Sequence, residues 1–147
     1  MGIRCFLIEP ILGIEIPYEP REWPPYRTIL GWLRPDTGEE HTHKKDFGVG
    51  AMWRATWIPR NWDWTNETEP HIYVCCPNGE DGTRDWDIDS RAANCTMPHD
   101  KKHRCWIRHG VPPNLTVDKQ GLTCAAGAGS IAMPKWHGFL RNGELVP

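Results

Sequence analysis

Side chains able to bind a metal, form a disulfide or transfer a proton are concentrated between residues 94 and 110. This stretch, NCTMPHDKKHRCWIRHG, contains two cysteines and three histidines: Cys95, His99, His103, Cys105 and His109. Thiolate and imidazole groups are the ligands that Zn²⁺ prefers in tetrahedral sites. The stretch therefore indicates three kinds of chemistry, which are metal binding, disulfide formation and nucleophilic catalysis.

A structural zinc site is the first of these. We predict that its ligands are Cys95, His99, His103 and Cys105. The fourth position is also open to His109 or to a thiolate from the adjacent pair Cys75 and Cys76. The spacing Cys-x₃-His-x₃-His-x-Cys differs from that of standard zinc fingers. A bound metal would nevertheless order this proline-interrupted loop between two strands.

Two other chemistries are open to the same kinds of side chain. A disulfide between Cys95 and Cys105 would close a short loop if the protein reaches an oxidising environment, such as an extracellular virion. Alternatively, the thiol of Cys124 is a nucleophile, with His109 or His137 as its base. The backbone N–H groups of the AAGAGS segment that follows would then form an oxyanion hole. The simplest interpretation is that these residues only fill core and turn positions.

Three carboxylates alternate with apolar residues in the segment DWDID. This pattern predicts a strand that carries Asp85, Asp87 and Asp89 on one face and Trp86 and Ile88 on the other. Three carboxylates on one face suit a hard cation. A solvated strand face accounts for them equally well.

Short strands must position these groups. Apolar runs predict strands at 3–8, ending at Glu9-Pro10, at 12–18, at 71–76 and at 115–117. The adjacent cysteines Cys75 and Cys76 must then point to opposite faces of their strand. The charged segment 39–46 is expected to be a surface loop.

One short helix and one hairpin complete the expected elements. Trp53 and Trp57 have the i, i+4 spacing of a helix, so we expect one or two helical turns near Trp53. Asn142-Gly143 between apolar pairs is a strong signal for a two-residue β-hairpin at the end of the chain.

Length and composition agree with this outline. The chain has 147 residues, which suits a single domain over 1–147, and its 14 glycines and 14 prolines favour turns over long helices. Nine tryptophans supply large buried areas to a fold rich in loops. The predicted fold is mainly β, a single compact domain of short antiparallel strands with a C-terminal β-hairpin, and a small α+β fold is the variant.

Charge and hydropathy exclude some partners. The formal net charge is −2, which gives no general electrostatic surface for nucleic acid. No apolar run approaches the roughly 18 residues of a membrane span. The N-terminus lacks a secretory signal, so we expect a soluble protein made in a reducing cytosol, without nucleic-acid or membrane partners.

Several segments of the chain resemble known sequences. They are FLIEP at 6–10, GAMWRATW at 50–57, DWDIDSRAANCT at 85–96, HRCWIRHGVPPNLTVDK at 103–119, TCAAGAGSI at 123–131 and HGFLRNGEL at 137–145. Together they cover about half of the chain and resemble an uncharacterised group of bacteriophage-encoded proteins. The resemblance implies a phage source and a β-rich fold.

A wider set of small phage and bacterial proteins is similar more remotely. Those proteins carry Cys-x-Cys-Gly on a strand and Cys-x-x-His at the start of the final hairpin. This chain has Cys75-Cys76-Pro77 at the first position and no cysteine three residues before His137. Their metal-binding pattern is therefore not reproduced here.

The expected function follows from these observations. We expect a phage-encoded structural or binding protein, located in the host cytoplasm or in the virion, whose Cys/His cluster holds a structural zinc. Its partners would be other phage proteins or further copies of itself. The alternative is a small metal- or cysteine-dependent hydrolase that uses Cys124, His109 and His137.

Overall fold

The structure is a computed structural model in which strands predominate. It describes residues 2–16, 26–55, 70–79, 82–92, 94–97, 99–100, 103–119, 124 and 129–147. A short 3₁₀ helix, η1 (Lys44–Phe47), lies between strands. No described helix has the length and apolar character needed to cross a bilayer. The mainly β fold predicted from the sequence is confirmed.

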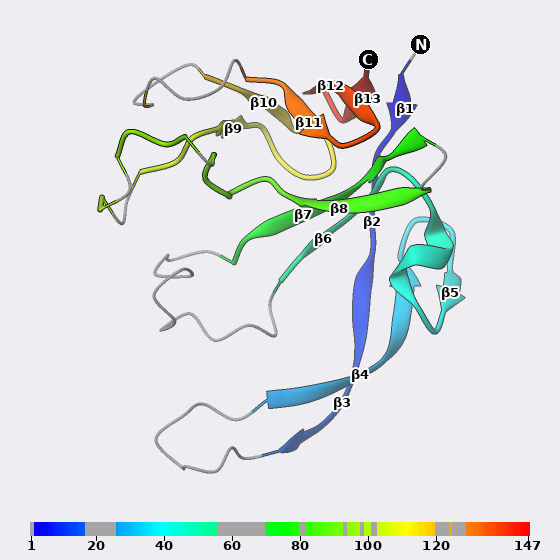
Figure 1. Cartoon of the computed structure of the whole chain (residues 1–147). Helices are drawn as coiled ribbons and strands as arrows, with labels where there is room; N and C mark the ends of the chain where they lie inside the picture. The colour runs from blue at the N-terminus through cyan, green and yellow to red at the C-terminus, as the bar shows by residue number, and fades with distance from the viewer. Residues whose placement is uncertain are drawn as a thin grey trace.

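A four-stranded sheet occupies the centre of the molecule (Figure 1). Its order is β2 (Phe6–Leu7), β6 (Ala51–Arg54), β7 (Ile72–Pro77) and β8 (Thr83–Asp87). The β2–β6 pair is parallel, and the other two pairs are antiparallel. The predicted strand at 71–76 thus corresponds to β7, shifted by one residue.

Both faces of this central sheet are buried. Successive residues of β7 alternate between two hydrophobic cores, so that Cys76 belongs to the first core and Cys75 to the second. The first core also contains Met52 and Val74, and the second contains Trp53. The prediction that the two adjacent cysteines point to opposite faces is confirmed.

The C-terminal strands cover the face that bears the first core. β11 (Ile131–Met133), β12 (Trp136–Arg141), β13 (Glu144–Val146) and β1 (Ile3–Arg4) form one sheet. β9 (Ile107–His109) and β10 (Thr116–Asp118) form a separate antiparallel pair. These two sheets, together with the residue just before β10, pack buried aliphatic side chains into the first core: Leu115, Val117, Ile131, Leu140 and Leu145.

The fourth sheet contributes Trp32 to the second core and then extends away from it. β3 (Glu9–Ile16), β4 (Tyr26–Arg34) and β5 (Glu39–His41) pair in that order. Trp32 of β4 meets Trp53 edge-on, with ring centroids 6.1 Å apart. Beyond this contact, residues 11–16 and 26–31 extend from the body as a two-stranded ribbon, which we call the arm (Figure 1).

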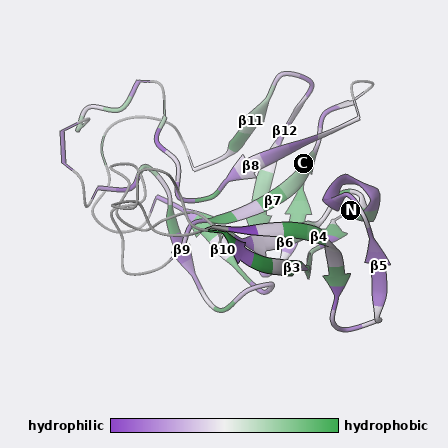
Figure 2. Cartoon of the chain, turned by 90° about the horizontal axis from the view of Figure 1, so that it is seen from below, coloured by the Kyte–Doolittle hydropathy of each residue, from purple (hydrophilic) through white to green (hydrophobic). Residues whose placement is uncertain are grey.

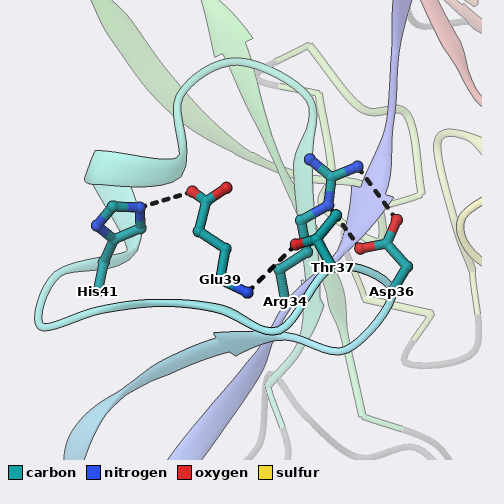
Figure 3. Close-up of polar contacts among 5 residues, drawn as sticks. All are labelled: Arg34, Asp36, Thr37, Glu39 and His41. Carbon is teal, nitrogen blue, oxygen red and sulfur yellow. Dashed lines mark hydrogen bonds and ion pairs between the residues drawn. The ribbon is translucent and has the colours of Figure 1, made fainter.

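Polar contacts close the turn between β4 and β5 (Figure 3). The Arg34 guanidinium forms two hydrogen bonds to the Asp36 carboxylate, at 2.6 and 3.1 Å. Its hydrogen bonding lowers the pKa of Asp36. The Thr37 hydroxyl accepts a hydrogen bond from the Glu39 backbone N–H, and the Glu39 carboxylate contacts the His41 ring at 2.6 Å. The hydrophilic β5, η1 and β8 lie toward the outside of the molecule (Figure 2).

Three local predictions are wrong. Residues 51–54 form strand β6 rather than a helix, because Trp53 pairs across the sheet with Tyr73 and stacks on its ring at 5.8 Å. Trp57, which suggested the helix, lies outside the described residues. Glu9-Pro10 begins β3 rather than ending a strand, and an edge strand tolerates a proline. The expected loop at 39–46 contains β5 and the start of η1.

The C-terminal hairpin is confirmed. β12 and β13 pair in the register Arg141↔Glu144 and Leu140↔Leu145. Asn142 and Gly143 both have positive φ, 47° and 75°, as a two-residue type I′ turn requires. Gly143 also donates its N–H to the Leu115 carbonyl at 2.9 Å, so the turn is held against the chain just before β10.

This close approach predicts the effect of adding a methyl group. A Cβ at Gly143 would lie 2.7 Å from the Pro113 carbonyl oxygen, whereas one at Gly38, which has a similar φ of 80°, would meet nothing within 4 Å. Gly38→Ala should therefore cost only the backbone strain, about 1 kcal/mol, and Gly143→Ala about 2–4 kcal/mol. Urea unfolding measures both values. Equal costs would contradict the close packing of this turn.

Candidate metal centre

Four side chains meet beside the β9–β10 pair. They are Cys95, His103, Cys105 and Cys124, and one ligand atom from each lies within 4.8 Å of all the others. The Cys105 Sγ atom is 3.7 Å from the Cys124 Sγ atom and 3.6 Å from the His103 Nε2 atom. We call these four residues the Cys₃His group. Its geometry is compatible with a metal ion.

Successive turns bring the first two members together. Cys95 donates its N–H to the Ala92 carbonyl at 3.1 Å. Further along, the Asp100 N–H bonds to the Met97 carbonyl at 3.3 Å, and the His103 N–H bonds to the Asp100 carbonyl at 3.2 Å. Each of these hydrogen bonds closes a turn of the chain. The turns bring His103 close to Cys95, although seven residues separate the two in the sequence.

Arg91 fixes this loop from outside the Cys₃His group. Its guanidinium donates to the Met97 carbonyl at 2.7 Å and to the Asp100 carbonyl. These are the same two carbonyls that accept the turn hydrogen bonds. The loop is thus held at two points by one side chain with a planar set of donors.

The other two members come from the ends of the β9–β10 pair. Cys105 lies two residues before β9, and Cys124 follows β10. Because β10 runs antiparallel to β9, with Asp118 opposite Ile107, the end of β10 lies beside the start of β9, two residues after Cys105. Cys124 thus meets Cys105 although 18 residues separate them in the sequence.

The Cys₃His group is shielded from water. Cys105 is fully buried, His103 and Cys124 are 5% and 8% exposed, and Cys95 is partly buried. Burial, together with the neighbouring thiols of Cys95 and Cys124, raises the pKa of the Cys105 thiol to about 11. The thiol is therefore protonated at neutral pH unless a cation displaces its proton, as metal binding does.

Trp106 connects the Cys₃His group to the first core. Its ring packs against the small cluster formed by Cys105 and Cys124 and also against the first core. It meets Trp86 edge-on, with centroids 5.5 Å apart, and its indole N–H donates to the Ser130 carbonyl at 3.3 Å. Trp106 thus joins the Cys₃His group to the packing of the central sheet.

Known proteins give no guide to this centre. Comparison of the chain with protein-family models, with curated proteins and with solved structures gives no match. The interpretation of the Cys₃His group therefore rests on its own geometry.

The structure brings together three of the four predicted ligands. Cys95, His103 and Cys105 lie in the group, whereas His99 is exposed and is not among its members. The fourth member is Cys124, which the sequence suggested only as a nucleophile. No local spacing marks Cys124 as a ligand, since 18 residues separate it from Cys105. Only the antiparallel pairing of β9 with β10 would have indicated it.

The residues of the alternative chemistries have other contacts in the structure, and one of these chemistries, the disulfide, is absent. All six cysteines are free, so no disulfide joins Cys95 to Cys105. The exposed His109 ring contacts the Asp118 carboxylate at 2.8 Å, and the exposed His137 ring contacts the Ser130 hydroxyl at 2.8 Å. Residues 125–128 of the proposed oxyanion hole lie outside the described residues.

A second cluster of titratable groups lies at the end of β8. The His71 Nδ1 atom is 2.9 Å from an Asp87 carboxylate oxygen. Asp89 accepts a hydrogen bond from the Ile72 N–H at 3.0 Å and pairs with Arg108 at 3.4 Å. The carboxylates of Asp87 and Asp89 thus contact the His71 ring and the Arg108 guanidinium. We call these four side chains the ion-pair network.

The expected solvated face of three carboxylates is therefore only partly correct. Asp85 is exposed and pairs with Lys44 at 3.6 Å. Asp89 lies beyond the end of β8 at Asp87 and is only 8% exposed, where the Ile72 N–H and Arg108 contact its carboxylate. Burial raises the pKa of Asp89.

The His71–Asp87 contact predicts how stability varies with pH. Hydrogen bonding to Asp87 raises the pKa of His71 above its ordinary value of 6.5. The contribution of this pair to the free energy of unfolding is then complete below about pH 6.5, and it is lost as the pH rises through the folded-state pKa. Asp87→Asn should remove this slope and cost about 1–3 kcal/mol at pH 6.

Asp85→Asn, an exposed change on the same strand, is the matched control and should retain the slope. The measurement is urea unfolding between pH 5.5 and 9 for the three proteins. An unchanged slope in the Asp87→Asn variant would show that His71 titrates independently of Asp87.

Proposed function

We propose that this chain is a phage-encoded structural or binding protein in which a structural zinc ion holds the loop between β8 and β9. The observation that carries this proposal is that Cys95, His103, Cys105 and Cys124 already supply four ligands. Structural zinc sites are closed by four protein ligands, whereas catalytic sites keep a position open for water or substrate. The same group engages Cys124, which the hydrolase alternative requires as a free nucleophile.

Distances within the group support zinc. With Zn–S bonds of about 2.3 Å and Zn–N bonds of about 2.05 Å at tetrahedral angles, two sulfurs lie about 3.8 Å apart and a sulfur and a nitrogen about 3.6 Å apart. The corresponding separations are 3.7 Å for the Cys105 and Cys124 sulfurs and 3.6 Å for Cys105 Sγ and His103 Nε2. These two separations match those expected around one tetrahedral zinc ion, and all four ligand atoms lie within 4.8 Å of one another.

Ligand chemistry supports zinc as well. Three thiolates and an imidazole form a soft set that disfavours Mg²⁺ and Ca²⁺, which prefer oxygen. The Met97 N–H donates to the Cys95 sulfur at 3.4 Å. Such a backbone donor stabilises the negative charge of a metal-bound thiolate.

The zinc proposal predicts one metal ion per chain and a clear difference between two histidines. His103→Asn should lose most of the metal, because it removes a ligand, and should lower the midpoint of thermal unfolding by about 10 °C or more. His99→Asn is the control, since this exposed residue lies outside the Cys₃His group. Elemental analysis and thermal unfolding, with and without a chelator, measure these effects. A metal-free wild-type protein would contradict the proposal.

The arm supports a role in assembly. Ile14 and Leu30 are 78% and 65% exposed on it. Within the described residues, β3 pairs with β4 alone, and β4 meets β5 only over residues 32–34. The arm therefore presents open strand edges and apolar side chains, which are features of strands that pair with another chain. The proposed partners are further copies of this chain or other phage proteins.

Self-association through the arm is testable with charged substitutions. The double change Ile14→Asp and Leu30→Asp should reduce self-association at least tenfold, because burying two carboxylates at a strand-pairing surface costs about 3 kcal/mol or more. Val111→Asp, which alters an apolar residue 71% exposed elsewhere, is the control. Sedimentation velocity over a concentration series measures the change. Equal association of both variants would contradict a role for the arm.

A further inference from the structure

A cavity separate from the Cys₃His group lies beside the ion-pair network. Its volume is about 380 Å³, within the usual range of small-ligand sites. Apolar walls come from Ile72 and Leu115, which are buried, and from Val111, which is 71% exposed. Two arginines, Arg54 and Arg108, also line the cavity.

The fold places the two arginines on different strands around this cavity. Arg54 is the last residue of β6 and pairs with Ile72 of β7, which itself lines the cavity. Arg108 is the central residue of β9, opposite Val117 of β10. The central sheet and the β9–β10 pair thus each contribute one guanidinium group.

A buried carboxylate, Asp89, fixes the position of the Arg108 guanidinium. The guanidinium pairs at 3.4 Å with Asp89, which is 8% exposed and is itself fixed by the Ile72 N–H at 3.0 Å. A buried carboxylate therefore sets the position of this cation at the cavity wall. Such support limits the conformational entropy that an arginine loses when a ligand binds.

The charge of the cavity favours an anion. None of the described residues that line it carries a carboxylate, and both charged lining residues are arginines. Arg54 is exposed and forms no ion pair with another described residue. Guanidinium groups bind carboxylate and phosphate oxygens through paired N–H donors, and apolar walls bind a hydrocarbon portion.

We propose that this cavity binds a small ligand that combines one oxyanion group, a carboxylate or a phosphate, with a short apolar body. The oxyanion contacts Arg54 and Arg108, and the apolar body packs on Ile72 and Leu115. This site uses neither the Cys₃His group nor the exposed apolar residues of the arm. Its ligand binding is therefore independent of the proposed zinc and assembly roles.

Titration of the full-length protein with hexanoate tests the proposal, with hexyl phosphate as a second probe and hexanamide as the uncharged control. NMR chemical shifts or calorimetry report the affinity. The expected result is saturable binding of at least one of the two anions, about tenfold or more tighter than hexanamide. The tighter of the two anions then identifies the carboxylate or phosphate class.

Three variants locate the binding site. Arg54→Gln should weaken anion binding about tenfold. Arg108→Lys keeps the positive charge beside Asp89 but loses the planar fork, and it should also weaken binding. Arg84→Gln removes one exposed charge from β8, outside the cavity lining, and should leave the affinity unchanged.

Two results would overturn the proposal. One is equal binding of hexanoate, hexyl phosphate and hexanamide, or no saturable binding of any of them at millimolar concentration. The other is an equal loss of affinity in the Arg54→Gln and Arg84→Gln variants, which would indicate general electrostatic attraction. If the Arg108→Lys variant fails to fold, the comparison of Arg54→Gln with Arg84→Gln still decides the question.

Discussion

Burial of the central sheet on both faces is the constraint on which the other layers depend. Strand β7 carries Val74, Cys75 and Cys76 in succession, all at most 2% exposed and directed into alternate cores. A strand of this kind cannot face water on either side, so it needs a layer on each. The C-terminal strands cover one face, and Trp32 with its neighbours covers the other. The arm begins beyond Trp32, after the layer that covers this second face.

Among the described residues, the region beside β9 contributes a smaller buried cluster. Its small apolar cluster contains Cys105 and Cys124, with Cys95, Ala92 and Trp106 against them. Each ordered residue of a loop costs about 1–2 kcal/mol of backbone entropy. Four ligands to one metal ion would offset part of that cost. The Trp106 ring would then transmit that rigidity to the first core.

Sequence reasoning succeeded where the physical signal is local. Asn142-Gly143 predicts its turn because both positions need positive φ, and the strand at β7 is visible as an apolar run between turn residues. It failed at Trp53, where cross-strand stacking on Tyr73 overrides a helical spacing. It also missed Cys124, because its proximity to Cys105 depends on strand pairing between distant segments. Asp89 is a similar case, since its burial is caused by partners from β7 and β9.

X-ray absorption at the zinc edge tests the central claim most directly, because it counts the ligand atoms and measures their distances in the intact protein. The account predicts a first shell of three sulfurs at about 2.3 Å and one nitrogen at about 2.0 Å, with no bound water. Loss of one sulfur in a Cys124→Ala variant would identify the ligand that the sequence did not reveal. A shell dominated by oxygen and nitrogen, or one unchanged by that substitution, would contradict the Cys₃His group as the metal centre.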